Sequence, residues 1–360
     1  MINLEPSGKN TANQFFYIIG DNGSGKSQYL SDSVARHREE FDKILALPCG
    51  IFDRFDPKSS GNYHYLGFKS KRNSVFLSSV GRTITGLVLN LIKNRKFDAI
   101  QRILDNLQLK LSFEGAATLW DNRPAKERRA SEDQMLLAEA AIEKYRKAKK
   151  GWTRFPKKEA ALLESCTNLN LKFFAKFKPH NRKNYVHPED LSSGYVQKLK
   201  MLLLIAKEAE NNSLILIDEP EISLHVKWQA ELPKLFRDAV EGLTGCRIIV
   251  ATHSAVIISN TTQEHDFIYS IPEDQTLQSE DVAENIETLL FNKFKYLPLS
   301  SHIIPDTCAK IIHRVTHGTA SVSTCKEEIK ELKKNTLSDR DEKLLSKTAE
   351  VIEIVEKNIQ

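Results

Sequence analysis

The sequence has no long apolar run of the kind that anchors a chain in a membrane. Its longest unbroken apolar stretches are short, such as Met201 to Ala206 and Leu214 to Ile217, whereas a membrane-spanning helix needs about 18 or more such residues. The first residues, Met-Ile-Asn-Leu-Glu, lack the basic start and apolar core of a secretion signal. We therefore expect a cytoplasmic protein without a membrane partner.

Cysteine is also scarce, and it forms no pattern. No Cys-x-x-Cys pair occurs, and no His lies nearby at metal-binding spacing, so a zinc site is not expected. Free thiols in a reducing compartment are the simplest interpretation. The five cysteines are Cys49, Cys166, Cys246, Cys308 and Cys325.

The charge is nearly balanced over the whole chain but not along it. The net charge is +5, which says little about partners. Residues 141–185 alone, however, contain thirteen Lys or Arg against three Glu. An anionic partner meets local charge first, so this segment is a candidate surface for nucleic acid. A solvated helical face with core aromatics is an equally weighted interpretation.

The 360 residues are enough for one large domain with an insertion. Alternating strand and helix patterns over 1–120 and 186–275 predict an α/β domain with a mostly parallel sheet, in two sequence halves. Residues 121–185 break this rhythm and read as a basic, mostly helical insertion that includes a strand at 169–177. Residues 276–360 read as a helical C-terminal region, with breaks near Gly318 and Asn335.

A glycine-rich turn follows the first apolar strand and matches G-x-x-x-x-G-K-[ST] in full. Glycines let backbone N–H groups converge on phosphates, Lys26 supplies a charge for the β- and γ-phosphates, and the Ser27 hydroxyl is suited to Mg²⁺. The turn predicts an ATP site. Its expected phosphate-binding residues are Gly20, Asn22, Gly23, Ser24, Gly25, Lys26, Ser27 and Gln28.

Two further apolar strands end in polar turns. Residues 213–217 precede Asp218 and Glu219, and four consecutive large aliphatics suit a strand buried on both faces. We expect Asp218 to hold Mg²⁺ and Glu219 to polarise the attacking water, with Lys26 as the cationic catalytic residue. The strand at 247–252 ends at His253.

The segment Leu-Ser-Ser-Gly-Tyr-Val-Gln at 191–197 precedes a long helical pattern. Ser192 or Ser193 can cap that helix, and Gly194 permits close approach of the backbone. A capped helix N-terminus attracts anions, although an ordinary serine cap is the simpler interpretation when the segment is taken alone.

Together the four motifs resemble the ABC ATPase superfamily, with Walker A at 20–27, a signature at 191–197, Walker B at 214–219 and a switch histidine at 253. The segment Glu-Pro-Glu-Ile-Ser-Leu-His at 219–225 resembles one SMC-like branch. That branch includes the overcoming-lysogenisation-defect nucleases and ATPase subunits of Septu and retron-associated anti-phage systems. The signature departs from Leu-Ser-Gly-Gly-Gln, and no loop glutamine is assigned, since Gln101 and Gln108 have no convincing context.

The resemblance implies a sandwich dimer in which each ATP lies between Walker A of one subunit and Ser192, Ser193 and Gly194 of the other. His253 then contacts the γ-phosphate as a third catalytic residue. It also implies a regulatory ATPase that controls a separately encoded effector, nuclease or toxin, in prokaryotic anti-phage defence. The alternative is a DNA-repair or chromosome-maintenance ATPase that acts directly on nucleic acid.

Two other classes fit less well. A transporter subunit would carry a coupling glutamine soon after Walker A, and none is evident. A self-contained nuclease would need a metal site in the C-terminal region. The tripeptide Asp339-Arg-Asp341 there has the letters of the Asp-x-Asp pattern found in such sites. A solvated helix start is the favoured interpretation of that tripeptide, and about 80 residues are too few for such a domain.

Overall fold

The computed structural model describes residues 12–50, 52–67, 69–71, 74–75, 80–119, 140, 157–158, 160–161, 171–261, 266–271, 275–278, 303–333 and 339–359. Its centre is a seven-stranded sheet in the order β11-β10-β1-β9-β8-β2-β3. Every neighbouring pair is parallel except β10 with β11. The strands are β1 (Gln14–Ile19), β2 (Lys43–Pro48), β3 (Tyr63–Tyr65), β8 (Ser213–Asp218), β9 (Arg247–Thr252), β10 (Asp266–Ser270) and β11 (Gln275–Gln278).

Alternating side chains of the central strands enter two different cores. Tyr17 of β1 and Ile215 of β8 lie in the larger core, while their chain neighbours Phe16 and Leu216 lie in the smaller one. This alternation follows from the two-residue period of a strand, and a sheet covered on both faces needs apolar residues at every position. The aliphatic run of β8 is the clearest example, because each of its six residues is buried.

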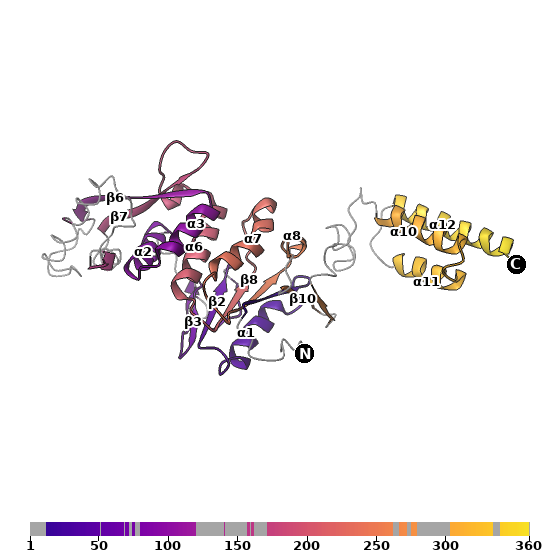
Figure 1. Cartoon of the computed structure of the whole chain (residues 1–360), viewed down its shortest axis with the longest axis horizontal. Helices are drawn as coiled ribbons and strands as arrows, with labels where there is room; N and C mark the ends of the chain where they lie inside the picture. The colour runs from indigo at the N-terminus through magenta and orange to yellow at the C-terminus, as the bar shows by residue number, and fades with distance from the viewer. Residues whose placement is uncertain are drawn as a thin grey trace.

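Helices cover both faces of the sheet (Figure 1). Helix α1 (Lys26–Arg36) places Leu30 in the smaller core. The other face is covered by helices that contribute residues to the larger core. These helices are α2 (Val80–Lys93), α3 (Phe97–Asn106), α6 (Ser193–Glu208), α7 (Val226–Ala239) and α8 (Ala255–Ser259).

A long antiparallel ribbon extends from this body. Strand β6 (Leu109–Leu119) pairs with β7 (Leu171–Pro179), beginning with Leu109 opposite Pro179. Ala175 and Phe177 of β7 are fully buried in the larger core, and the Ala175 N–H donates to the Thr85 hydroxyl of α2 at 2.9 Å. The expected strand at 169–177 is thus present, as β7, and fixed to the body that contains the central sheet. A short 3-10 turn, η3 (Pro188–Asp190), follows the ribbon, and β4 (Lys69–Lys71) with β5 (Ser74–Val75) forms a separate hairpin.

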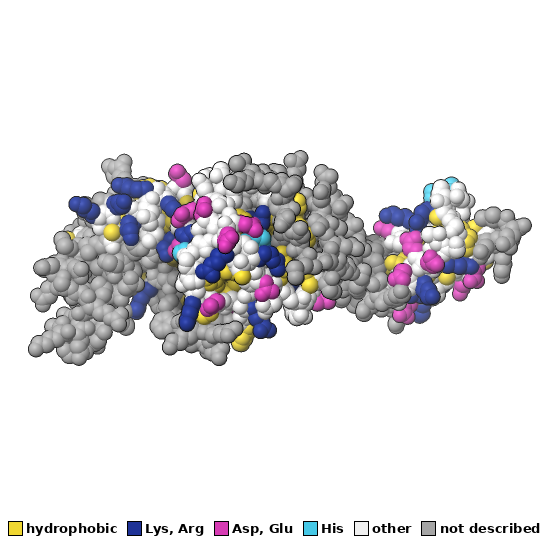
Figure 2. Space-filling view, turned by 90° about the horizontal axis from the view of Figure 1, so that it is seen from below, with side chains coloured by type: hydrophobic (Ala, Val, Ile, Leu, Met, Phe, Trp, Pro, Cys, Tyr) yellow, Lys and Arg dark blue, Asp and Glu magenta, His cyan; other side chains and the backbone are white. Residues whose placement is uncertain are grey.

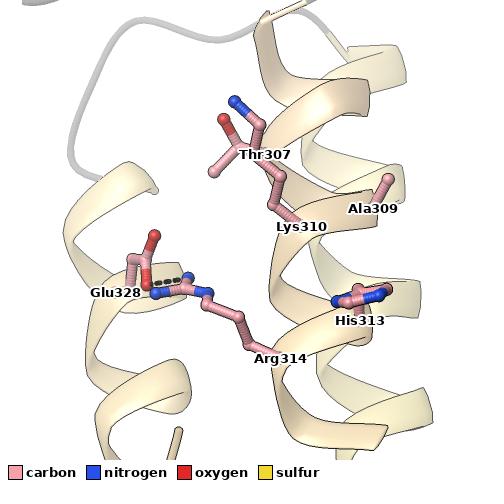
Figure 3. Close-up of a pocket in the computed structure, with 6 residues that line it drawn as sticks. All are labelled: Thr307, Ala309, Lys310, His313, Arg314 and Glu328. Atoms are coloured by element: carbon pink, nitrogen blue, oxygen red, sulfur yellow. Dashed lines mark hydrogen bonds and ion pairs between the residues drawn. The ribbon is translucent and has the colours of Figure 1, made fainter. Parts of the chain in front are cut away.

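The region expected to be helical, 276–360, begins instead within strand β11, which pairs with β10 at the sheet edge, so the expectation is wrong there. Three helices form the rest of its described part: α10 (Ile303–Thr316), α11 (Val322–Leu332) and α12 (Asp339–Ile359). They have a core of their own. The expected break at Gly318 is present, with φ at +67°, whereas Asn335 lies outside the described residues. A shallow groove between α10 and α11 is crossed by the Arg314–Glu328 ion pair at 2.6 Å (Figure 3).

The sequence patterns predicted most of these elements, with ends within a few residues. The helices expected within 121–185 lie almost entirely outside the described residues, and only positions 140, 157–158 and 160–161 are described as helical there. The Asp339 tripeptide does begin a helix, α12, but Asp341 is 5% exposed, so its expected solvation is wrong. In the described part of the chain, no helix is both long enough and apolar enough to cross a membrane. The domain division stays a prediction.

Candidate nucleotide-binding site

The glycine-rich turn joins β1 to the start of α1, as its sequence predicted. Gly23 and Gly25 have φ of +83° and +98°, a region that residues with a Cβ rarely adopt. A Cβ on Gly20 would lie 2.5 Å from the Ile271 carbonyl oxygen and 2.7 Å from Ser24 Oγ. The turn is therefore restricted to glycine at three positions, and its backbone is free to wrap around a small anion.

Lys26 lies inside this turn rather than in solvent. Its Nζ donates to the carbonyl oxygens of Gly20 at 2.7 Å and Asp21 at 2.8 Å, and the residue is 5% exposed. Burial lowers the pKa of Lys26, and the nearby carboxylates of Glu219 and Glu221 oppose that shift. A cation held by two neutral carbonyl groups can exchange them for phosphate oxygens, which are stronger acceptors.

Ser27 and Asp218 meet where α1 begins and β8 ends. Ser27 Oγ donates to Asp218 Oδ1 at 3.1 Å. Burial raises the pKa of Asp218 to about 6, and the charges of Glu219, Asp53 and Glu221 add to that rise while the Ser27 hydrogen bond opposes it. A hydroxyl and a carboxylate so close together fit Mg²⁺, which is usually held by one or two carboxylates together with substrate phosphates.

The ion would need water or phosphate oxygens to complete its shell. Within the described ranges, no group of three His, Cys, Asp or Glu side chains could hold a metal ion. In Mg²⁺ sites of the P-loop type, the hydroxyl and the nucleotide supply the other ligands.

Glu219 follows Asp218 in a strained backbone conformation. Its φ is +51°, unusual for a residue with a Cβ, and its N–H donates to the Ala251 carbonyl of β9 at 2.9 Å. That bond fixes the turn to the neighbouring strand. Strain held in this way is common at functional sites, where it aims a side chain.

His253 lies at the end of β9, directly beside the end of β8 in the sheet. Its ring Nδ1 is 3.1 Å from Glu221 Oε1, and its backbone N–H donates to the same oxygen at 2.7 Å. The structure thus brings Lys26, Ser27, Asp218, Glu219 and His253 to one edge of the sheet, at the carboxyl ends of the strands where α/β proteins bind ligands.

The signature segment begins α6, as predicted. Ser192 occupies the N-cap position, but its side chain makes no capping hydrogen bond, so the expected serine cap is wrong in that detail. Ser192 and Ser193 are exposed. Gly194 is buried, and a Cβ there would lie 2.3 Å from Trp228 Cζ3. Within one chain, Gly194 therefore packs closely against Trp228 of α7. Its contact with nucleotide stays a prediction.

Two acidic residues at this edge were missed by the sequence analysis. Glu221 contacts His253, and Asp53, 9% exposed, follows β2 and accepts from Tyr65 OH at 3.0 Å. The strand order could have revealed them, because acids just beyond adjacent parallel strands meet at one edge. Neither of the glutamines considered for the coupling loop lies at this edge. Gln101 donates to Asp105 on α3, and Gln108 lies between α3 and the start of β6.

The family described as "AAA domain, putative AbiEii toxin, Type IV TA system" matches residues 51–259, more than half of the 360 residues. No curated protein matches the sequence significantly. Solved structures similar to the chain include a putative metal-chelate type ABC transporter, at 15% identity and a TM-score of 0.35 over 78% of each chain.

Two others are a SmcHead bound to the C-winged helix domain of ScpA and UvrA2 from Deinococcus radiodurans. The first has 13% identity and a TM-score of 0.35 over 77% of this chain and 92% of the other. The second has 15% identity and a TM-score of 0.31 over 71% and 32%. The fold assignment rests on the parallel sheet and the P-loop described above.

Proposed function

The chain belongs to the family of AAA domains described as putative AbiEii toxins of Type IV TA systems, and from this premise we propose a regulatory ATPase of anti-phage defence. It is a P-loop ATPase with an ABC-like α/β fold. In the proposal, ATP binding joins two copies, and the joined state controls a separately encoded effector that is a nuclease or a toxin.

The observation that carries this proposal is the phosphoryl-transfer centre at the sheet edge. The P-loop backbone and Lys26 would bind the phosphates, while Ser27 and Asp218 would hold Mg²⁺, which supplies charge stabilisation. Glu219, fixed at positive φ next to Asp218, would orient the attacking water, and His253 would contact the γ-phosphate.

The proposed dimerisation is supported by exposed residues at the start of α6. Ser192 and Ser193 are exposed at the start of α6, and no hydrogen bond among the described residues joins their side chains to the P-loop. The first N–H groups of a helix attract anions. We propose that they bind the γ-phosphate of an ATP held by a second copy, so that each site needs both subunits.

Glu219→Gln tests this arrangement, because the amide still occupies the site but polarises water poorly. We expect normal ATP binding, turnover lower by about two orders of magnitude or more, and accumulation of an ATP-bound dimer. Light scattering with ATP and Mg²⁺ measures the mass, and Glu241→Gln on the surface is the matched control. A variant that binds ATP and stays monomeric would contradict the proposed dimer.

Control of an effector is tested in cells. The gene and its neighbours, expressed together in a bacterial host, should lower phage yield, and Lys26→Ala should remove that protection. If the neighbouring genes encode permeases, or if protection is unchanged in Lys26→Ala, the defence function is wrong while the ATPase assignment stands.

A second candidate, direct action on nucleic acid, is favoured by the β6–β7 ribbon. Lys110 lies directly opposite Lys178, and like charges in that position destabilise a ribbon unless an anion binds between them. Arg182 and Lys183 are exposed in the turn that follows. Figure 2 shows basic side chains gathered at the end of the molecule where Figure 1 places β6 and β7.

Reversing Lys178, Arg182 and Lys183 to Glu should weaken DNA or RNA binding, with a smaller dependence on salt because fewer counterions are released. Fluorescence anisotropy at several salt concentrations measures both effects, and basal ATP hydrolysis is the control. Equal binding by the variant would leave the ribbon as a structural element or a protein-docking face. The 141–170 part of the predicted basic segment lies almost wholly outside the described residues.

A further inference from the structure

Glu221 holds the turn that carries His253 from three directions. Its Oε1 accepts from the Thr252 hydroxyl at 2.6 Å and the His253 backbone N–H at 2.7 Å, and it lies 3.1 Å from Nδ1 of the His253 ring. The residue is 4% exposed, so water does not compete with these bonds. Two short hydrogen bonds to one buried carboxylate oxygen fix the turn, and they place the His253 ring beside that oxygen.

The other side of the turn is fixed as well. The Ser254 N–H donates to Thr252 Oγ1 at 3.0 Å, and the Ser254 hydroxyl donates to Gln229 Oε1 of α7 at 2.6 Å. The His253 side chain itself is 44% exposed. The ring therefore has Nδ1 beside the Glu221 carboxylate, and its Nε2 is the nitrogen left to meet a ligand.

These contacts determine where the hydrogens of the ring must be. A carboxylate only accepts hydrogen bonds, so the Nδ1 that faces Glu221 must carry a hydrogen. A neutral ring then has a lone pair at Nε2, which repels a phosphate oxygen. Contact with phosphate requires a second hydrogen on Nε2, and that makes the ring an imidazolium.

We infer that Glu221 is a positioning residue that makes His253 bind the γ-phosphate as an imidazolium, so that ATP binding takes up one proton. The inference rests on the proposed contact between His253 and ATP. The proton comes from solvent, adds to Nε2 and leaves when the nucleotide leaves. No bond of ATP is broken in this step.

The other charges at this edge bear on the same equilibrium. Asp218 and Glu219 at the end of β8 and Asp53 after β2 are carboxyl groups that favour a cation, while Lys26 on α1 opposes one. Among the described residues Glu221 is the charged group that bonds the ring. Its removal should therefore have a specific effect on proton uptake.

Calorimetry of the full chain measures this uptake directly. Titration of ATPγS with Mg²⁺ at about pH 8, in buffers that differ in ionisation enthalpy, gives protons taken up per nucleotide. Asp218, with its pKa raised to about 6, is already ionised at this pH. We expect an uptake of between about 0.5 and 1 proton for the unaltered protein.

Two variants and a control complete the experiment. His253→Gln should bind ATPγS with uptake near zero, and Glu221→Gln should bind it with less than about half of the unaltered uptake. Glu241→Gln, a surface carboxylate, should match the unaltered protein, and far-UV circular dichroism should show each variant folded. Should either Glu221→Gln or Glu241→Gln fold poorly, the His253→Gln comparison still decides.

The outcomes separate the two claims. Nucleotide binding without proton uptake, or equal uptake in His253→Gln, would overturn the imidazolium and leave the proposed ATPase site intact. Failure of the unaltered protein to bind ATPγS would overturn the proposed function, and this inference with it. Binding with uptake that falls in both variants supports the inference.

Discussion

Asp218 illustrates a side chain whose position costs stability. Its carboxyl is 4% exposed, and burial next to Glu219, Asp53 and Glu221 raises its pKa from 3.8 to about 6. A raised pKa means that the folded protein disfavours the ionised form that Mg²⁺ requires. Such a cost is expected where selection favours a functional charge over a stable fold.

The sign of this effect gives a prediction. Since the folded pKa of Asp218 exceeds its unfolded value, the ionised carboxylate destabilises the fold increasingly as pH rises from about 4 to 6, and by a constant amount above. We expect Asp218→Asn, without nucleotide, to raise the free energy of unfolding by about 1–3 kcal/mol near pH 8 and by less near pH 5. Urea unfolding at both pH values measures this. A variant less stable than the parent near pH 8 would contradict it.

At the scale of elements, the signature helix is positioned by its packing on α7. Trp228 packs against Gly194. Lys198 Nζ lies over the Trp228 ring, 4.4 Å from its centroid, and forms an ion pair with Glu231 at 3.1 Å. Gln197 of the same helix donates to the Pro220 carbonyl at 3.1 Å, between Glu219 and Glu221. The exposed serines thus lie on an element that is bonded to the turn carrying Glu219.

Gly194→Ala tests the packing. A Cβ 2.3 Å from Trp228 Cζ3 and 2.6 Å from Cε3 must displace the ring, so we expect a loss of about 1–3 kcal/mol in unfolding free energy. The loss should shrink in a Trp228→Leu background, as a double-mutant cycle shows. Ser193→Ala, at the exposed neighbour, should change stability by less than about 0.5 kcal/mol. Equal losses in both backgrounds would show that Trp228 is not the obstacle.

Local sequence patterns predicted the elements that carry the site, for a physical reason. The buried strands β1, β8 and β9 are continuous apolar runs, and each ends in polar residues that a parallel sheet gathers at one edge. The pairing of β6 with β7 was not predicted, because the register of strands separated by about 50 residues leaves no local period. The Glu221–His253 contact was missed for a similar reason, since it joins two turns across the sheet.

At the scale of the molecule, the ATPase body has surfaces that its chemistry does not use. The β6–β7 ribbon and the three C-terminal helices contribute no residue to the nucleotide edge within the described ranges. An ATPase cycle does no useful work unless another surface responds to it. In the proposed function, an effector or a nucleic acid would sense bound ATP through one of these two elements.

The central claim is that each ATP site is built from two copies, and mixing two inactive variants tests it most directly. Lys26→Ala removes the cation that binds phosphate in the P-loop, and Ser193→Arg blocks the exposed signature segment that would complete the partner's site. Each variant alone should show no ATP hydrolysis. An equal mixture should recover roughly a quarter of the parent rate, because half of the dimers are mixed and each has one intact site. A mixture as inactive as its components would contradict the account.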